Sequence, residues 1–316
     1  MADSPTPRPD IAVDLCGMRL ANPVILASGI LGISREMIAR VAECGAGAAV
    51  IKSVTVQPRA GHNNPTVIAY EAGLLNAVGY SNPGVEEAVR EFDGIDELPI
   101  PVFASAVGQE ADEFAEVAAR LMPCGFAAVE IPLSCPHTPG YGTLAGHSTP
   151  EATERIARAV RSATDRPIFV KLSPNVEGIG DLALAALEGG ADGISAVNTL
   201  GPGMIINVEA REPVLDFKVG GVSGPALRPV AVRCVYDVAT ALRNSKREAP
   251  IIGVGGVGRG RDALEMIMAG ATAVGVGTAV YQRGIEVFGT IAAELRDLCA
   301  RLGIASLEEV RGAVLD

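Results

Sequence analysis

Two lysines lie at the carboxyl ends of short apolar runs, where they could meet a ligand. Lys52 ends the run GAAVIKS (47–53), and Lys171 lies in the run PIFVKLS (167–173). Lysine is almost never fully buried without a partner. Two lysines at equivalent ends of apolar runs therefore predict a site for an anionic or electron-rich group.

A cysteine follows another apolar run and is flanked by prolines. The run AAVEIPL (127–133) is followed by Ser134, Cys135 and Pro136. Prolines fix φ and remove a backbone donor, so this turn has a defined shape. A thiolate here can act as a nucleophile or as a base. His137 is too close in sequence to be presumed a triad base, which favours a base working beside a redox cofactor.

Two more runs end in small residues that can approach a phosphate. PIIGVGG ends in Gly255 and Gly256, and TAVGVGT ends in Gly277 and Thr278. Glycine lets backbone N–H groups approach a phosphate, and a following helix adds partial positive charge. Barrels of alternating strands and helices commonly bind phosphate after their last two strands. The pattern predicts a phosphate-bearing ligand.

These residues all belong to a set of eight apolar, β-branched runs that alternate with helix-like stretches. Continuous apolar runs are typical of parallel strands buried on both faces. Eight such units predict a single (β/α)₈ TIM barrel. An open, doubly wound sheet is the alternative, but no GxGxxG follows the first run. The runs cover residues 22–28, 47–53, 101–107, 127–133, 167–173, 192–198, 250–256 and 272–278.

The segments between the runs predict helices and two long excursions. Helical spacing and caps indicate helices at 111–122, 149–163 and 261–271. The stretches 54–84, after the second strand, and 199–224, after the sixth, are too long for plain loops. Both leave the carboxyl ends of strands, where barrel active sites lie. We expect them to cover the site.

Composition narrows the class of protein. The chain has 316 residues and a net charge of −11, which disfavours nucleic acid as a partner. Its six cysteines include no CxxC pair and its three histidines form no cluster, which disfavours disulfide, iron–sulfur and metal sites. The polar first ten residues predict a flexible tail before one domain at 11–316, with neither signal peptide nor membrane span. A reducing cytoplasm fits best.

Nine short stretches occur in an order typical of one enzyme family: NPVILASGILG, IKSVTVQPRAGHNNP, LLNAVGYSNPG, LSCPH, VKLSPNV, AVNTLGPGM, GGVSGPALRP, IIGVGGV and MAGATAVGVGTA. The chain resembles a class 1 dihydroorotate dehydrogenase, and most closely the catalytic subunit of class 1B. This resemblance implies an FMN-containing barrel, a homodimer, and oxidation of dihydroorotate to orotate in pyrimidine biosynthesis. It also implies a second subunit with FAD and an iron–sulfur cluster, which transfers electrons.

The resemblance assigns roles by position. The FMN phosphate is expected on Gly255, Gly256, Gly277 and Thr278, with Gly224 nearby. The flavin and its ribityl chain are expected to meet Ser28, Lys52, Ser53, Ser105, Lys171 and Val197. Lys171 is the candidate for the edge of the isoalloxazine that becomes anionic on reduction, where a positive charge stabilises it.

The substrate and the base are assigned in the same way. Cys135 occupies the position of the base that removes a proton from C5 while hydride leaves C6. No metal is implied. The substrate is expected at Lys52, Asn76, Asn198 and Thr199, and at the backbone of Ala77, Val78, Gly79 and Tyr80.

Four positions depart from the family pattern. Pro132 replaces an asparagine that normally contacts both flavin and substrate, and proline has neither a side-chain amide nor an N–H. Ser105 and His137 each replace an asparagine, and Tyr80 stands where leucine is frequent. Pro132 leaves open another dihydropyrimidine, such as dihydrouracil, as the substrate. An FMN-binding subunit active only with an electron-transfer partner, and a flavin-free aldolase or isomerase barrel, are further alternatives.

Overall fold

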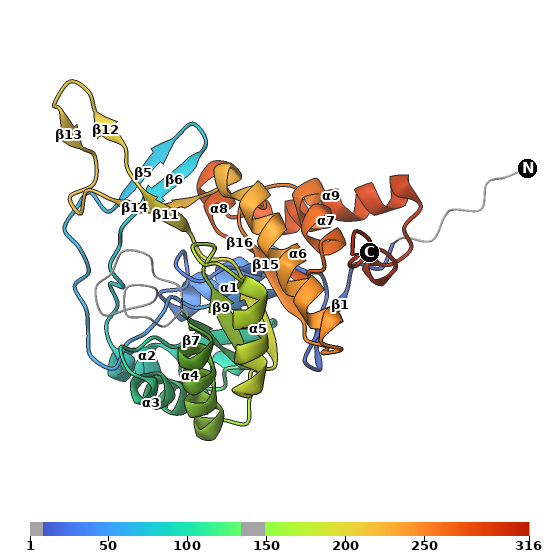
Figure 1. Cartoon of the computed structure of the whole chain (residues 1–316), viewed down its shortest axis with the longest axis horizontal. Helices are drawn as coiled ribbons and strands as arrows, with labels where there is room; N and C mark the ends of the chain where they lie inside the picture. The colour runs from blue at the N-terminus through green and yellow to red at the C-terminus, as the bar shows by residue number, and fades with distance from the viewer. Residues whose placement is uncertain (1–8, 134–148, 316) are drawn as a thin grey trace, which may run out of the picture.

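A closed barrel of eight parallel strands forms the centre of the protein (Figure 1). The structure, a computed structural model, describes residues 9–133 and 149–315. Each barrel strand falls inside one of the eight predicted runs, so the predicted fold class is confirmed. In chain order the strands are β3 (Val24–Leu26), β4 (Ala48–Val50), β7 (Val102–Ser105), β8 (Ala128–Pro132), β9 (Ile168–Leu172), β10 (Gly193–Ala196), β15 (Ile251–Val254) and β16 (Ala273–Val276).

Helices between the strands surround the barrel. The sequence signals of α4 act as predicted, because Thr149 accepts a hydrogen bond from the amide of Ala152 and Pro150 occupies the first turn. The helices are α1 (Arg35–Glu43), α2 (Val85–Phe92), α3 (Ala111–Leu121), α4 (Pro150–Ala163), α5 (Ile179–Glu188), α6 (Arg228–Asn244), α7 (Gly260–Met268), α8 (Thr278–Arg283) and α9 (Val287–Leu302). Short 3₁₀ turns cover Ile95–Glu97, Met122–Cys124, Pro225–Leu227 and Leu307–Glu309.

Side chains fill the barrel interior in layers. The rings of Phe103 and Phe169 stack with their centroids 5.4 Å apart, and both side chains are fully buried. Successive strand residues face opposite sides, so Lys171 lies on the same inner face as Phe169, one layer closer to the carboxyl end. Glu130 pairs with Phe169 and Ser195 pairs with Lys171 across the ladders. A polar layer therefore lies above an aromatic one.

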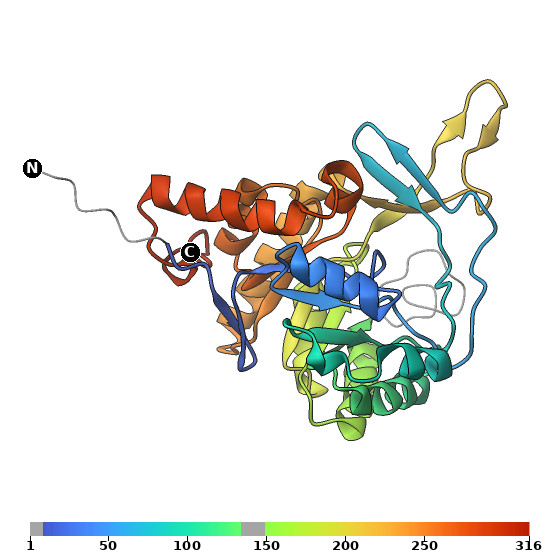
Figure 2. The same cartoon turned by 180° about the vertical axis from the view of Figure 1, so that it is seen from behind.

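The two predicted excursions join in one antiparallel sheet, in the strand order β11-β14-β6-β5. Its strands are β5 (Val67–Tyr70), β6 (Gly73–Asn76), β11 (Leu200–Gly203) and β14 (Gly220–Ser223). The ring of His62 stacks on Phe217 at 4.0 Å and so connects the two excursions again. A small hairpin, β12 (Ile206–Asn207) with β13 (Glu212–Pro213), extends from the same end of the molecule in both views (Figures 1 and 2).

The amino-terminal part of the described chain packs at the opposite end of the barrel. A hairpin of β1 (Val13–Leu15) and β2 (Met18–Leu20) places Cys16 Sγ 3.8 Å from the carbonyl of Asp192, just before β10. Asp10, which the sequence assigned to the tail, bridges to Ser306 and belongs to the folded part. No helix of the described residues is long and apolar enough to cross a membrane.

Candidate active site

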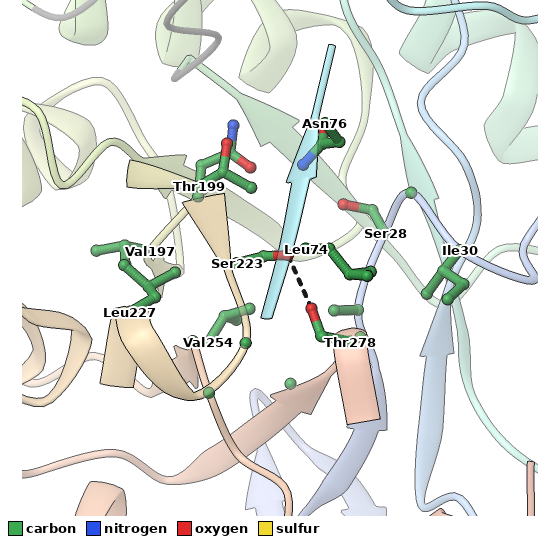
Figure 3. Close-up of a pocket in the computed structure, with 18 of the residues that line it drawn as sticks. Ser28, Ile30, Leu74, Asn76, Val197, Thr199, Ser223, Leu227, Val254 and Thr278 are labelled. Atoms are coloured by element: carbon green, nitrogen blue, oxygen red, sulfur yellow. Dashed lines mark hydrogen bonds between the residues drawn. The ribbon is translucent and has the colours of Figure 1, made fainter. Parts of the chain in front are cut away.

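A cavity of about 360 Å³ lies at the carboxyl ends of the barrel strands. This volume is in the range of small-molecule sites. Residues from both excursions line it together with residues at the ends of the barrel strands, so the sheet formed by the excursions covers the barrel at this point. Figure 3 shows Asn76 and Thr199 in the upper part of the cavity, above Ser223 and Thr278.

Most of the residues predicted from the sequence come together here, although they lie far apart in the chain. Among the predicted cofactor residues, those that line the cavity are Ser28, Lys52, Ser53, Lys171, Val197, Gly224, Gly255, Gly256, Gly277 and Thr278. Among the predicted substrate residues, they are Asn76, Val78, Gly79, Tyr80, Asn198 and Thr199, with Lys52 common to both sets.

Three predicted residues are not among those that line the cavity. Ser105 is fully buried behind Ser53, with 2.9 Å between the two hydroxyl oxygens, so it supports the wall rather than forming it. Ala77 is also buried, and its N–H donates to the carbonyl of Thr66 while its own carbonyl lies 3.1 Å from His62 Nδ1. Cys135 lies outside the described residues, which stop at Leu133 and resume at Thr149.

The loops after β15 and β16 form a glycine-rich wall. Gly256 has φ +74°, and a Cβ there would lie 2.6 Å from Arg228 Cβ, because this loop packs against the start of α6. Gly277 differs, since a Cβ there would meet no atom within 4 Å. Thr278 Oγ1 donates to Ser223 Oγ at 2.8 Å, which ties β14 of the cover to this wall (Figure 3).

A buried ion pair lies beneath the cavity. Lys171 Nζ donates to Ser28 Oγ at 3.1 Å and lies 3.7 Å from Glu130 Oε1. Glu130 Oε1 also accepts from Ser28 Oγ at 2.8 Å, and Oε2 accepts from Ser195 Oγ at 2.9 Å. Because a carboxylate only accepts and an ammonium only donates, the proton of Ser28 points to Glu130. The cation of this pair faces the cavity, since Lys171 lines it and Glu130 does not.

The second lysine has a different environment. Burial without a compensating charge lowers the pKa of Lys52 below its ordinary value of 10.5. No carboxylate among the described residues forms an ion pair with it. Lys52 is thus a desolvated cation at the cavity wall, which an anionic ligand group would stabilise.

The cover contributes further polar groups to the cavity. Asn76 Nδ2 donates to the carbonyl of Gly221 at 3.1 Å, which leaves Oδ1 as the acceptor of this amide. A Cβ on Gly221 would lie 2.1 Å from Thr199 Oγ1, so glycine is required for Thr199 to keep its place. Pro132 lines the same cavity and presents no polar side-chain atom there.

The sequence patterns missed several residues. Glu130 and Ser195 lie inside apolar strand runs, and their pairing across 65 residues leaves no local signal. Ser223 and Gln282 also line the cavity. Ser223 directly precedes the predicted Gly224, and this adjacency is the one signal that could have found it. Within residues 9–133 and 149–315, no three His, Cys, Asp or Glu side chains are placed to hold a metal ion.

Fold and site together define an α/β barrel built for a phosphate-bearing cofactor. The chain belongs to the dihydroorotate dehydrogenase family, whose family model matches residues 10–299. It is 43% identical over 302 residues to the catalytic subunit of dihydroorotate dehydrogenase B (NAD(+)) of Pyrococcus furiosus, covering 96% of this chain and 98% of that protein. The corresponding subunit of Methanosarcina acetivorans is 44% identical over 301 residues, 95% of this chain and 94% of that protein.

A solved structure supports the fold independently. The crystal structure of a dihydroorotate dehydrogenase from Eimeria tenella in complex with ferulenol superposes with a TM-score of 0.83. The two chains are 23% identical, and the match covers 99% of this chain and 90% of the other. At this identity the likeness concerns the fold alone.

The family binds FMN, and the residues present fit this cofactor. The open space at Gly277, and similar open space at Gly29, would admit a ligand close to the backbone. Backbone amides beyond β15 and β16 suit a phosphate. The Lys171 ammonium at the cavity suits a ring that becomes anionic on reduction.

We expect Gly277→Ala to weaken FMN binding without disturbing the barrel, because the added methyl enters the open space beside the expected phosphate. The dissociation constant for FMN should rise about tenfold or more, the equivalent of one hydrogen bond to a charged group. Titration of apo-protein with FMN, followed by flavin fluorescence, measures it. Val208→Ala, at a side chain 72% exposed and outside the cavity, is the control. Unchanged FMN affinity in Gly277→Ala would place the phosphate elsewhere.

Proposed function

We propose that this chain is the FMN-dependent catalytic subunit of a dihydroorotate dehydrogenase and oxidises dihydroorotate to orotate in pyrimidine biosynthesis. The observation that carries the proposal is one cavity with a glycine-lined wall, a paired lysine and an unpaired lysine. The glycine-lined wall suits the phosphate of FMN. Lys171 suits the flavin ring, and Lys52 suits the carboxylate of dihydroorotate. The family match and the two archaeal relatives support the same activity.

Bound FMN would supply the acceptor for the hydride that leaves C6 of the substrate. Cys135 takes the proton from C5 as the base. Lys52 binds the substrate carboxylate, while Asn76, Asn198 and Thr199 orient the ring. The cover lies over the barrel at this point, and shielding from solvent strengthens electrostatic contacts.

The assignment of Cys135 rests on its position in the chain. Pro132 lines the cavity at the end of β8, and Cys135 follows three residues later. Three extended residues span at most about 11 Å, so the chain limits how far Cys135 can be from the cavity wall. The SCP sequence of the family supports the same role.

We propose that electrons pass from FMN to a second subunit. The relatives are named catalytic subunits of an NAD(+) enzyme, which supports a second subunit carrying FAD and an iron–sulfur cluster. The proposal includes a homodimer, which the sequence resemblance supports, and a cytoplasmic location, which the cysteine pattern supports. The alternative, in which this chain is active only together with the second subunit, differs from the main proposal only in which acceptor takes the electrons from FMN.

The substrate is tested by reducing the protein-bound flavin without oxygen. Dihydroorotate should bleach the flavin absorbance, whereas dihydrouracil should not, because it lacks the carboxylate that Lys52 binds. Rapid bleaching by dihydrouracil and none by dihydroorotate would favour the alternative suggested by Pro132. Fumarate, NAD and quinone are then compared as acceptors, with NAD expected to need the second subunit.

Removing the base should separate chemistry from cofactor binding. Cys135→Ala should lower flavin reduction by dihydroorotate at least about 100-fold, the low end for loss of a general base, and retain FMN. Stopped-flow absorbance measures the reduction rate. Cys234→Ala is the matched control, because burial and Asp237 raise the pKa of Cys234 to about 11 and keep it a neutral thiol on α6. A wild-type rate in Cys135→Ala would refute its role as the base.

The affinity for orotate should fall at high pH because of Lys52. Since desolvation lowers its pKa below 10.5, the ammonium loses its proton earlier than an ordinary lysine as pH rises. Binding of the carboxylate should be constant below that pKa and weaken up to tenfold per pH unit above it. The dissociation constant, obtained from the flavin spectrum between about pH 7 and pH 10, measures this.

Two variants test whether Lys52 causes the loss. Lys52→Met should bind orotate weakly at every pH, without the alkaline decrease. Lys52→Arg keeps its charge throughout, so any remaining affinity should also lack the decrease. An alkaline decrease that persists in both variants would assign the titration to another group.

A further inference from the structure

A buried carboxylate lies beneath the cavity, and the proposed reaction does not use it. Glu130 on β8 is 2% exposed and does not line the cavity. Its two oxygens accept from Ser28 Oγ at 2.8 Å and from Ser195 Oγ at 2.9 Å. Burying a charge is unfavourable unless it is paired and hydrogen-bonded. Both conditions are met here, which points to a role for the charge itself.

The partner of this carboxylate is the lysine at the cavity floor. Lys171 Nζ lies 3.7 Å from Glu130 Oε1, and the two side chains are 5% and 3% exposed. The ammonium has three N–H donors, of which one is used by Ser28. Donor capacity therefore remains toward the cavity, while the carboxylate stays on the far side.

We propose that Glu130 is a positioning residue that holds the Lys171 ammonium at the cavity floor, offsets its charge and so sets the redox potential of bound FMN. The inference rests on the proposed function, in which the flavin ring lies against Lys171. The hydride from the substrate carries two electrons, so the cofactor becomes more negative by one charge. Lys171 stabilises that charge, and Glu130 reduces the stabilisation.

The low-dielectric interior makes this effect large enough to measure. Charges buried in a protein are screened much less than surface charges. Among the described residues that line the cavity, Lys52 and Lys171 carry the charges, and both are cations. None of the described residues that line the cavity is a carboxylate that could replace Glu130. Its removal should leave the cavity more positive.

The test compares midpoint potentials of FMN in the purified holo-proteins, by spectroscopic titration against a reference dye. Glu130→Gln keeps the size of the side chain and removes its charge, so its potential should rise. We expect at least a tenfold higher ratio of reduced to oxidised flavin at a fixed potential, about 30 mV for two electrons. Lys171→Gln should shift the potential in the negative direction.

Further variants separate charge from structure. Ser195→Ala removes one hydrogen bond to Glu130 but no charge, and should leave the potential close to that of the wild type. Glu130→Asp retains the charge and should also stay closer to the wild type than Glu130→Gln. The double variant Glu130→Gln/Lys171→Gln should fall between the wild type and Lys171→Gln.

Three results would overturn the role of Glu130. These are an unchanged or lower potential in Glu130→Gln, an equal rise in Ser195→Ala, or a double variant identical to Lys171→Gln. The double variant contains no unpaired buried charge, so it decides the question if Glu130→Gln does not fold. If the wild-type chain bound no FMN, the proposed function would be contradicted. If it binds FMN and one of these three results is found, only the role proposed for Glu130 is contradicted.

Discussion

The active site depends on an ion pair enclosed in a barrel. Glu130 and Lys171 lie close to each other above the stacked rings of Phe103 and Phe169, where each charge offsets part of the cost of burying the other. Ser28 and Ser195 provide the hydrogen bonds that the carboxylate needs. Because the barrel closes around the pair, the cation is fixed at the one open end. The cavity floor is thus positive before any ligand arrives, although the chain has a net charge of −11.

The two lysines of the cavity differ in their electrostatic environment. Lys171 has its counter-ion in the protein, Glu130, so this ion pair is present without any ligand and suits a bound cofactor. Lys52 lacks a carboxylate partner among the described residues, and desolvation lowers its pKa, so its best partner is an anionic substrate. Burial disfavours the charged form of Lys52, and a bound substrate carboxylate would favour it again. Substrate binding is therefore linked to the charge of Lys52. Lys171, which is paired with Glu130, and Lys52, which has no carboxylate partner among the described residues, can therefore serve the same cavity in different roles.

Sequence patterns predicted the elements of the fold better than the contacts across the barrel. All eight strands, and the strand ends that carry Lys52, Lys171 and Gly277, follow from apolar runs and their end residues. Glu130 was missed because a single acidic residue in an apolar run gives no indication of a partner 65 residues away. Ala77 does not line the cavity, and the resemblance could not show that its N–H donates to Thr66 and that its carbonyl lies next to His62 Nδ1.

The cover brings to the cavity an amide side chain that Pro132 of the barrel does not provide. The pairing of β6 with β14 fixes Asn76 over the cavity, and the carbonyl of Gly221 takes the Nδ2 donor. The amide oxygen of Asn76 thus remains as an acceptor that the cover, and not the barrel, provides. This arrangement requires both excursions to fold together, because Asn76 comes from the second strand's excursion and Gly221 from the sixth's. In the proposed function the cover therefore contributes Asn76 to substrate binding, while the barrel contributes Lys52 for the substrate carboxylate and Lys171 for the cofactor.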